Sequence, residues 1–306
     1  IPTNSLTITF MKRRTFIKDS TLTAFSVATI GSIHWNGKTF VGDNATTTDI
    51  LGPFYRPGAP MRSNIIPAGS KGEVLHLHGT IFKKDGKSPL QNVSIEAWQC
   101  DEKETYDNTS DDYLLRGAVK SDKNGNYSFK TIVPVPYKAT PTNWRPAHIH
   151  LRVSSQDHQD LITQIYFKGD PYLATDISSS SPKSISRILD IGKNSAGEKV
   201  VAFNIVLADA YPLSDEGYNK LCGLYTLNKD GNAEFYREDD LLFVKFNGQV
   251  SDGLSYKGNN LFEGGLGRMQ AQFELPAEGN VKTKITYQRV TGIDTWEGTK
   301  FLKYSK

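Results

Sequence analysis

The stretch Val74-Leu75-His76-Leu77-His78-Gly79-Thr80-Ile81-Phe82 alternates in hydropathy with the two-residue period of a β-strand. The turn signal Asp85-Gly86-Lys87 follows, and Val93-Ser94-Ile95-Glu96-Ala97-Trp98 then alternates again. Alternating runs that flank an Asp-Gly turn are typical of antiparallel strands. This part of the chain therefore predicts a β-sheet.

Further strand patterns follow at regular spacing, and they define a first domain over residues 46–208. They cover residues 116–121, 127–132, 148–153, 161–167 and 200–207, and residues 184–190 form the one modest helix candidate. Short strands at this spacing, with turn signals between them, indicate an antiparallel β-sandwich or a partly closed barrel, and the sandwich is the predicted fold of this domain.

A second set of strand patterns occupies residues 217–306. We expect strands over residues 224–227, 241–246, 269–273 and 284–289, which predict a smaller C-terminal antiparallel β domain of unknown role. This segment contains no His, so no separate imidazole-based site is expected there. The predicted fold class is all-β.

Composition excludes several classes of protein. The 306 residues are enough for about two domains. Lys plus Arg number 36 and Asp plus Glu 33, a near-balance that argues against binding nucleic acid through bulk charge. Two cysteines, Cys100 and Cys222, exclude a disulfide scaffold and an all-cysteine zinc site, and nothing in the sequence pairs them. No uncharged apolar run approaches the roughly 20 residues of a membrane-spanning helix.

Residues 1–40 have the layout of a leader. From Met11 onward, the string Arg13-Arg14-Thr15-Phe16-Ile17-Lys18 precedes a short apolar stretch and resembles a twin-arginine export signal. Residues 1–35 carry four basic groups and one acidic group, which account for the whole net charge of +3. The expectation is a periplasmic or extracellular protein; the alternative is a basic tail on a cytoplasmic one.

The segment Trp144-Arg145-Pro146-Ala147-His148-Ile149-His150 carries the clearest chemistry. Residues i and i+2 of a strand share a face, so His148 and His150 can present two imidazoles to one metal ion. The alternative is a pair of exposed or core histidines. No Cys, Asp or Glu at a recognisable spacing completes a zinc or facial-triad site nearby.

Tyrosine is the other candidate ligand. Tyr137 follows the predicted strand over 127–132, and Tyr106 follows the one that ends at Trp98. A lone Tyr is ordinarily a packed aromatic residue. Two phenolates together with two imidazoles are a different case, because deprotonating a group with a pKa of about 10 requires a strongly charged cation. Fe(III) meets that requirement better than Zn(II) or Mg(II).

Several motifs, in order, resemble the intradiol ring-cleavage dioxygenases, the family of catechol 1,2-dioxygenase and protocatechuate 3,4-dioxygenase. The resemblance covers residues 46–208, about half of the chain. The matching segments are Gly52-Pro53-Phe54-Tyr55, Ile95-Glu96-Ala97-Trp98-Gln99, Arg116-Gly117 with residues 122–129, residues 131–137, Arg145-Pro146-Ala147-His148-Ile149-His150 and residues 161–167.

The resemblance implies a non-haem Fe(III) site. The implied ligands are Tyr106, Tyr137, His148 and His150, with Tyr137 and His150 as the axial pair. Tyr106 has a competitor in Tyr113, because the residue before Tyr106 is Thr where the family usually has Gly.

Other residues match substrate-facing positions of the family. Arg145 corresponds to the arginine that faces the substrate ring, and Gln164 to a polar group near the iron. Pro53 and Tyr55 are implied as substrate contacts. Together with Tyr137, Arg145 and Gln164 are the implied catalytic residues.

The implied reaction cleaves a catechol-type diol with O2 to a cis,cis-muconate-type diacid. The expected partners are thus a small diphenol and O2, with homo-oligomer formation left open. The long helical dimerisation segment of catechol dioxygenases is not seen between the leader and Gly52. Two alternatives remain at this point: a non-catalytic transthyretin-like binding module, and an iron-binding relative that acts on a larger diphenol.

Overall fold

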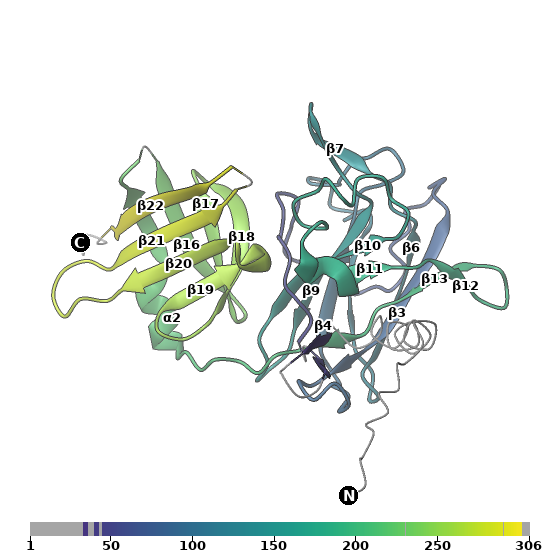
Figure 1. The fold of residues 1–306 in the computed structure, drawn as a ribbon, viewed down its shortest axis with the longest axis horizontal. Coiled ribbons are helices and arrows are strands. Elements are labelled where there is room, and N and C mark those ends of the chain that lie inside the picture. The colour runs from purple at the N-terminus through teal and green to yellow at the C-terminus, as the bar shows by residue number, and fades with distance from the viewer. Residues whose placement is uncertain (1–32, 36–39, 43–44, 230, 290, 302–306) are drawn as a thin grey trace, which may run out of the picture.

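The computed structural model describes residues 33–35, 40–42, 45–229, 231–289 and 291–301. The predicted leader over residues 1–40 lies outside them, apart from the short pair β1 (Ile33–Trp35) and β2 (Phe40–Gly42). Strands dominate, so the all-β prediction is confirmed. Two lobes lie side by side, an N-terminal lobe up to β14 and a C-terminal barrel from β15 onward (Figure 1). None of the described helices is long and apolar enough to cross a membrane.

Two five-stranded sheets build the N-terminal lobe. The first has the order β11-β10-β9-β4-β5, and the second has the order β12-β13-β3-β14 with β6 paired to β3. The first sheet contains β4 (Ser94–Trp98), β5 (Arg116–Lys120), β9 (His148–Ser154), β10 (Leu161–Phe167) and β11 (Ile188–Leu189). The second contains β3 (Val74–Phe82), β6 (Asn126–Ile132), β12 (Gly192–Lys193), β13 (Lys199–Ala202) and β14 (Ile205–Val206). A separate hairpin joins β7 (Tyr137–Thr140) to β8 (Asn143–Arg145).

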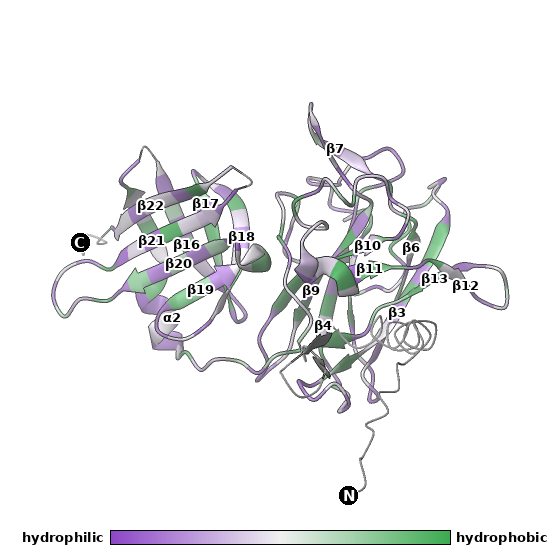
Figure 2. Cartoon of the chain, in the orientation of Figure 1, coloured by the Kyte–Doolittle hydropathy of each residue, from purple (hydrophilic) through white to green (hydrophobic). Residues whose placement is uncertain are grey.

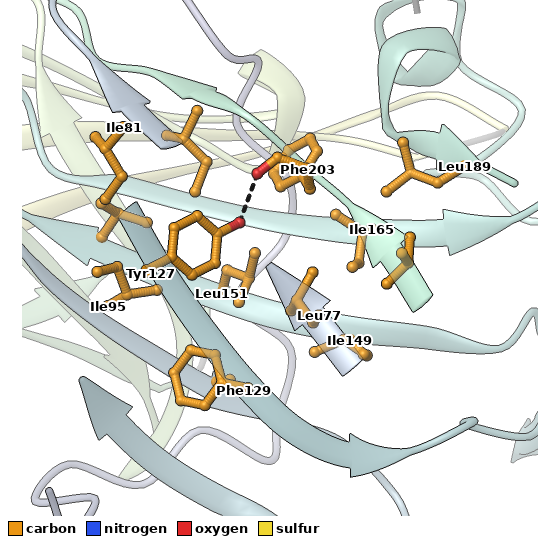
Figure 3. Packing of buried hydrophobic residues seen from close by; sticks show 14 of the residues in the cluster. Leu77, Ile81, Ile95, Tyr127, Phe129, Ile149, Leu151, Ile165, Leu189 and Phe203 are labelled. Atoms are coloured by element: carbon orange, nitrogen blue, oxygen red, sulfur yellow. Dashed lines mark hydrogen bonds between the residues drawn. The ribbon is translucent and has the colours of Figure 1, made fainter. Parts of the chain in front are cut away.

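One hydrophobic core lies between these sheets. Leu77 and Phe129 of the second sheet belong to the same buried cluster as Ile149 and Ile165 of the first (Figure 3). The one polar side-chain tip drawn there, the Tyr127 hydroxyl, donates a 2.7 Å hydrogen bond to the carbonyl of Phe203. A buried hydroxyl must find such a partner, because leaving it unpaired costs free energy.

The structure corrects three details of the predicted lobe. The sheets are mixed rather than antiparallel, since β13 and β14 run parallel to β3, and β11 runs parallel to β10. The strand predicted over 200–207 is broken at Phe203, where the chain passes so close to Gly79 that a Cβ there would lie 1.9 Å from the Phe203 oxygen. The helix predicted over 184–190 is instead the 3-10 turn η1 (Pro182–Arg187), because Ile188 and Leu189 pair with β10.

The C-terminal lobe is a closed eight-stranded barrel, where the sequence predicted only a small antiparallel β domain. Its strands are β15 (Gly223–Leu227), β16 (Asn232–Glu238), β17 (Leu241–Phe246), β18 (Gln249–Tyr256), β19 (Leu261–Gly264), β20 (Met269–Glu274), β21 (Lys282–Gln288) and β22 (Ile293–Lys300). The turn η2 (Gly265–Gly267) joins β19 to β20, and α2 (Asp215–Leu221) precedes the barrel. Hydrophobic and hydrophilic residues alternate along these strands (Figure 2), so one set fills the interior and the other faces outward.

Candidate metal centre

Strand β9 holds two imidazoles on the outer face of the first sheet. Ile149 and Leu151 point into the core between the sheets, so His148 and His150 point the other way. All four residues are buried, because the segment before Tyr55 and the barrel cover this outer face. The strand pattern therefore places both imidazoles on one buried face of the sheet, where a single ion can bind to both.

Two tyrosines from separate loops meet these imidazoles. The Tyr106 oxygen lies 3.2 Å from His148 Nε2, and His148 Nε2 lies 3.1 Å from His150 Nε2. The Tyr137 ring lies 5.5 Å from the Tyr106 ring and 5.6 Å from the His148 ring, measured between centroids. Phe54 stacks on Tyr106 at 4.3 Å and fixes its plane. The structure thus brings together all four predicted ligands.

Tyr113 lies outside this cluster. Its hydroxyl donates to the carbonyl of Pro57 at 3.1 Å, and the Arg56 guanidinium lies 4.3 Å from its ring centroid. Both interactions hold the side chain in the partly exposed loop before β5. Of the two candidates, it is Tyr106 that the tertiary structure brings to the imidazoles.

The hydrogen bonds of the imidazoles leave ligand atoms free. His148 Nδ1 lies 2.6 Å from the carbonyl of Pro146, which can only accept, so Nδ1 carries the proton and Nε2 keeps its lone pair. His150 Nδ1 has no partner among the described residues. Burial lowers the pKa of His148 to about 3 and places that of His150 well below its usual range, so both rings are neutral. Neutral imidazole is the form that binds metals.

Burial acts on the tyrosines in the opposite direction. It raises the pKa of Tyr137, and it raises that of Tyr106 well above 10, so without a cation both are phenols. Elsewhere in the described chain, His, Cys, Asp and Glu form no cluster of three or more that could hold a metal. The four-residue set, which consists of Tyr106, Tyr137, His148 and His150, depends on tyrosine oxygen for half of its ligand atoms.

Arg145 lies beside this set, directly opposite Tyr137 in the β7–β8 ladder. Its guanidinium donates to Asp176 Oδ2 at 2.9 Å, to Gln164 Oε1 at 3.0 Å and to the Tyr166 hydroxyl at 3.3 Å. Burial disfavours its charge, but Tyr166 and Asp176 raise the pKa of Arg145 well above its usual value. A fixed cation is therefore held next to Tyr137 and His148.

Gln164 is a further polar side chain of the site, on the strand next to the two imidazoles. It faces His150 in the β9–β10 ladder, and its amide donates to the carbonyl of Ile50 at 2.6 Å. Its oxygen accepts from both Arg145 and Tyr166. With both ends engaged, Gln164 orients Arg145 and anchors the covering segment.

Comparison with known proteins decides the family. A family model described as Dioxygenase matches residues 50–209, just over half of the chain. Chlorocatechol 1,2-dioxygenase of Rhodococcus opacus is 36% identical over 212 residues, which cover 61% of this chain and 79% of that relative. The chain belongs to the intradiol dioxygenase family. The prediction of a ring-cleaving oxidoreductase is thereby confirmed at the level of the family.

Other intradiol dioxygenases match over a smaller part of their length. Hydroxyquinol 1,2-dioxygenase of Corynebacterium glutamicum is 32% identical over 183 residues, which cover 54% of this chain and 59% of that relative. The solved structure of catechol 1,2-dioxygenase from an Acinetobacter species is 26% identical, with a TM-score of 0.50, and covers 66% of this chain and 71% of that one. For several relatives the chain thus spans little more than half of their length.

In this intradiol dioxygenase, Tyr55 and Pro53 lie at the border with the barrel. The Tyr55 hydroxyl accepts from Arg152 at 2.6 Å and donates to Glu238 of the barrel at 3.2 Å. Both partners lie away from the four-residue set, so this placement gives no support to a substrate contact by the Tyr55 hydroxyl. Pro53 lines a cleft that the barrel shares, and its substrate contact stays a prediction.

Sequence reasoning missed Trp98 and Asp176 as parts of the site. Trp98 faces His150 in the β4–β9 ladder, and the expected pairing of alternating strands could have indicated a contact between them. Asp176, which pairs with Arg145, lies in an irregular segment after β10. No periodic pattern exists there, so the sequence offered no signal for Asp176.

Proposed function

We propose that this chain cleaves a catechol-type aromatic diol between its two hydroxyl-bearing carbons, with O2, to a cis,cis-muconate-type diacid. We propose Fe(III) as the non-haem metal, bound by Tyr106, Tyr137, His148 and His150. The observation that carries the proposal is the convergence of buried Tyr106, His148 and His150 ligand atoms to 3.1 and 3.2 Å.

The arrangement fits an ion on two grounds. Ligand atoms that each bind one ion at about 2 Å lie about 3 Å apart when they are neighbours, as these are. The set combines phenol oxygens with neutral imidazoles, which suits a hard, highly charged cation. Bound there, Fe(III) supplies a Lewis acid and a template for the two oxygens of the diol.

The chain's own groups prepare the substrate for attack. Arg145 holds a fixed charge where an aromatic diol that has lost its protons carries negative charge, and such preorganised charge lowers the barrier. Tyr137 is the register partner of Arg145 in the β7–β8 ladder, and we assign its oxygen, when the ion holds it as phenolate, the role of accepting a proton from the diol. Asp176 and Gln164 keep the guanidinium in place.

We also propose that the two packed sheets of the N-terminal lobe form the β-sandwich of the family, and that the chain is exported through the twin-arginine string Arg13-Arg14. Export rests on sequence alone. A non-catalytic binding module has no use for four buried ligand side chains beside a buried arginine. The structure therefore favours the enzyme.

A visible absorption spectrum of the iron-loaded full chain tests the proposal. Phenolate bound to Fe(III) gives a red-brown charge-transfer band, which catechol should shift in the absence of O2. Admitting O2 should bleach the shifted band and release the diacid. A chain that stays colourless after iron loading would overturn the proposal.

Two tyrosine variants sharpen this test. Tyr106→Phe should shift and weaken the band because it removes one phenolate ligand. Tyr113→Phe is the matched control, since its hydroxyl is bonded to Pro57 outside the site, and it should keep the band. The reverse result would assign the iron ligand to Tyr113.

A further inference from the structure

A cleft of about 310 Å³ lies between the metal-site lobe and the barrel. Ile50, Gly52 and Pro53 form one wall, and the barrel residues Phe246, Gln249 and Tyr287 form much of the other. Gln249 begins β18, directly after the tight turn that follows Phe246. Both domains therefore contribute to one hollow.

The inner wall of this cleft touches the metal centre. A Cβ built on Gly52 would lie 3.3 Å from His150 Cε1 and 3.9 Å from His150 Nε2. The backbone of Gly52, with φ of 78°, is thus in contact with an imidazole on one side and with the cleft on the other. The Gly52 backbone thus stands between the His150 imidazole and this hollow, and Pro53 continues the same wall.

The barrel is firmly seated against the metal-site lobe. Asp252 of β18 accepts from the backbone N–H of Leu51 at 3.2 Å. Leu241 and Phe243 of β17 share one buried cluster with Leu51, Tyr106 and Tyr137. Because the same apolar cluster contains metal-site and barrel residues, the barrel wall stands in a defined position relative to the ligands.

The lining of the cleft suits an uncharged group. Phe246, Met269 and Tyr287 present apolar and aromatic surface, and the lining includes no Lys, Arg or His among the residues that the structure describes. Its one carboxyl group, Asp252, is buried, which raises its pKa to about 7. The Arg268 guanidinium stacks over Tyr287 and donates to the Gln288 carbonyl instead of lining the cleft. A carboxylate on the substrate would find no counter-charge in the lining.

We infer that the barrel forms the substituent-binding wall of the active site, and that the substrate is a catechol with a bulky, uncharged group on its ring. This inference rests on the proposed ring cleavage. Phe246, Gln249 and Tyr287 are then specificity-determining residues supplied by the second domain.

Binding can be read without turnover, from the shift of the charge-transfer band during anaerobic titration of the iron-loaded full chain. The probes are catechol, 4-tert-butylcatechol and protocatechuate. The wild-type chain should bind 4-tert-butylcatechol at least as tightly as catechol, and protocatechuate more weakly. Gln249→Trp fills the cleft from the barrel side and should weaken binding of 4-tert-butylcatechol, relative to catechol, by about tenfold or more, which is about 1.4 kcal/mol.

Gln272→Trp is the matched control. Gln272 lies on β20 and lines a different hollow, which is formed by barrel residues alone, so the ratio of the two affinities should stay at the wild-type value. If the ratio is also unchanged in Gln249→Trp, the barrel does not contact the substituent and the inference is overturned. Tighter binding of protocatechuate than of 4-tert-butylcatechol would overturn the preference for an uncharged group.

A failure of the proposed function has a different signature. In that case the wild-type chain shows no coloured iron complex, or catechol leaves its band unchanged, before any barrel variant is compared. A band that catechol shifts, with an affinity ratio that Gln249→Trp does not alter, leaves the ring cleavage standing and removes only the role of the barrel.

Discussion

The Trp98 indole lies flat against the His150 imidazole, with ring centroids 4.7 Å apart and an interplanar angle of 10°. The two residues are register partners in the β4–β9 ladder, so the sheet itself sets this contact. Tyr55 packs on Trp98 at 5.2 Å, and Phe243 of the barrel stacks on Tyr55 at 5.6 Å. The imidazole is therefore restrained by a column of aromatic rings that begins in the second domain.

Trp98→Leu should loosen His150 because it removes the flat surface under the imidazole. We expect a loss of about 2–4 kcal/mol in the free energy of unfolding, typical of truncating a large buried aromatic residue. Urea unfolding of the metal-free chain measures this loss, and chelator challenge of the iron-loaded chain measures iron retention. Trp98→Phe keeps a ring in place and should retain iron better; equal retention by both variants would contradict the restraint.

Gly52→Ala should disturb the metal centre directly. The new methyl group would press on the imidazole at 3.3 Å, in a backbone whose φ of 78° already disfavours Ala by about 1–2 kcal/mol. Gly197→Ala is the control, because its φ is 80° and its Cβ meets nothing within 4 Å. Both variants should lose similar stability, whereas only Gly52→Ala should alter the charge-transfer band. Identical spectra would show that Gly52 does not support His150.

Arg145→Lys tests whether the position of the positive charge at residue 145 matters, and not only its presence. Lys keeps the positive charge but cannot reach Asp176, Gln164 and Tyr166 at once, so the charge leaves its position. We expect kcat with catechol to fall by about 100-fold or more, while the charge-transfer band of the resting iron complex persists. Steady-state kinetics and the visible spectrum test this together. An unchanged kcat would remove Arg145 from the catalytic residues.

The interface between the domains should be sensitive to pH. Arg152 has four carboxylates within 4 Å: those of Glu96, Asp160, Glu238 and Asp239. One guanidinium cannot neutralise them all, and burial raises the pKa of Asp160 from 3.8 to about 8 and that of Glu96 from 4.5 to about 7.

A raised pKa means that the folded chain holds its proton more tightly than the unfolded chain does. The contribution of Asp160 to the free energy of unfolding should thus fall as pH rises from about 4 to about 8, by about 1.4 kcal/mol per pH unit for one proton. Asp160→Asn removes this contribution, so the variant should gain stability relative to wild type as pH rises. Urea unfolding at several pH values checks the trend, and a difference that does not vary with pH would refute it.

Much of the fold could be predicted because the hydropathy pattern of a strand is visible within a few consecutive residues. The alternation of Val74–Phe82 and the apolar run of Leu161–Phe167 matched β3 and β10 in full. The spacing of His148 and His150 was also sufficient to place both imidazoles on one face, since a strand leaves no other choice. Closure of the barrel was not predictable, because it depends on the pairing of β15 with β22, about 70 residues apart in sequence.

By itself, the sequence determined the all-β class, the family and three of the four candidate metal ligands: Tyr137, His148 and His150. The fold class follows from the two-residue hydropathy period of strands, and the family and the three residues follow from an ordered set of motifs. Only the tertiary structure placed Tyr106, and not Tyr113, beside the imidazoles, paired Asp176 with Arg145, and brought the barrel against the site. The physical reason is that these contacts join segments with no common period, so their positions depend on how loops and whole domains pack.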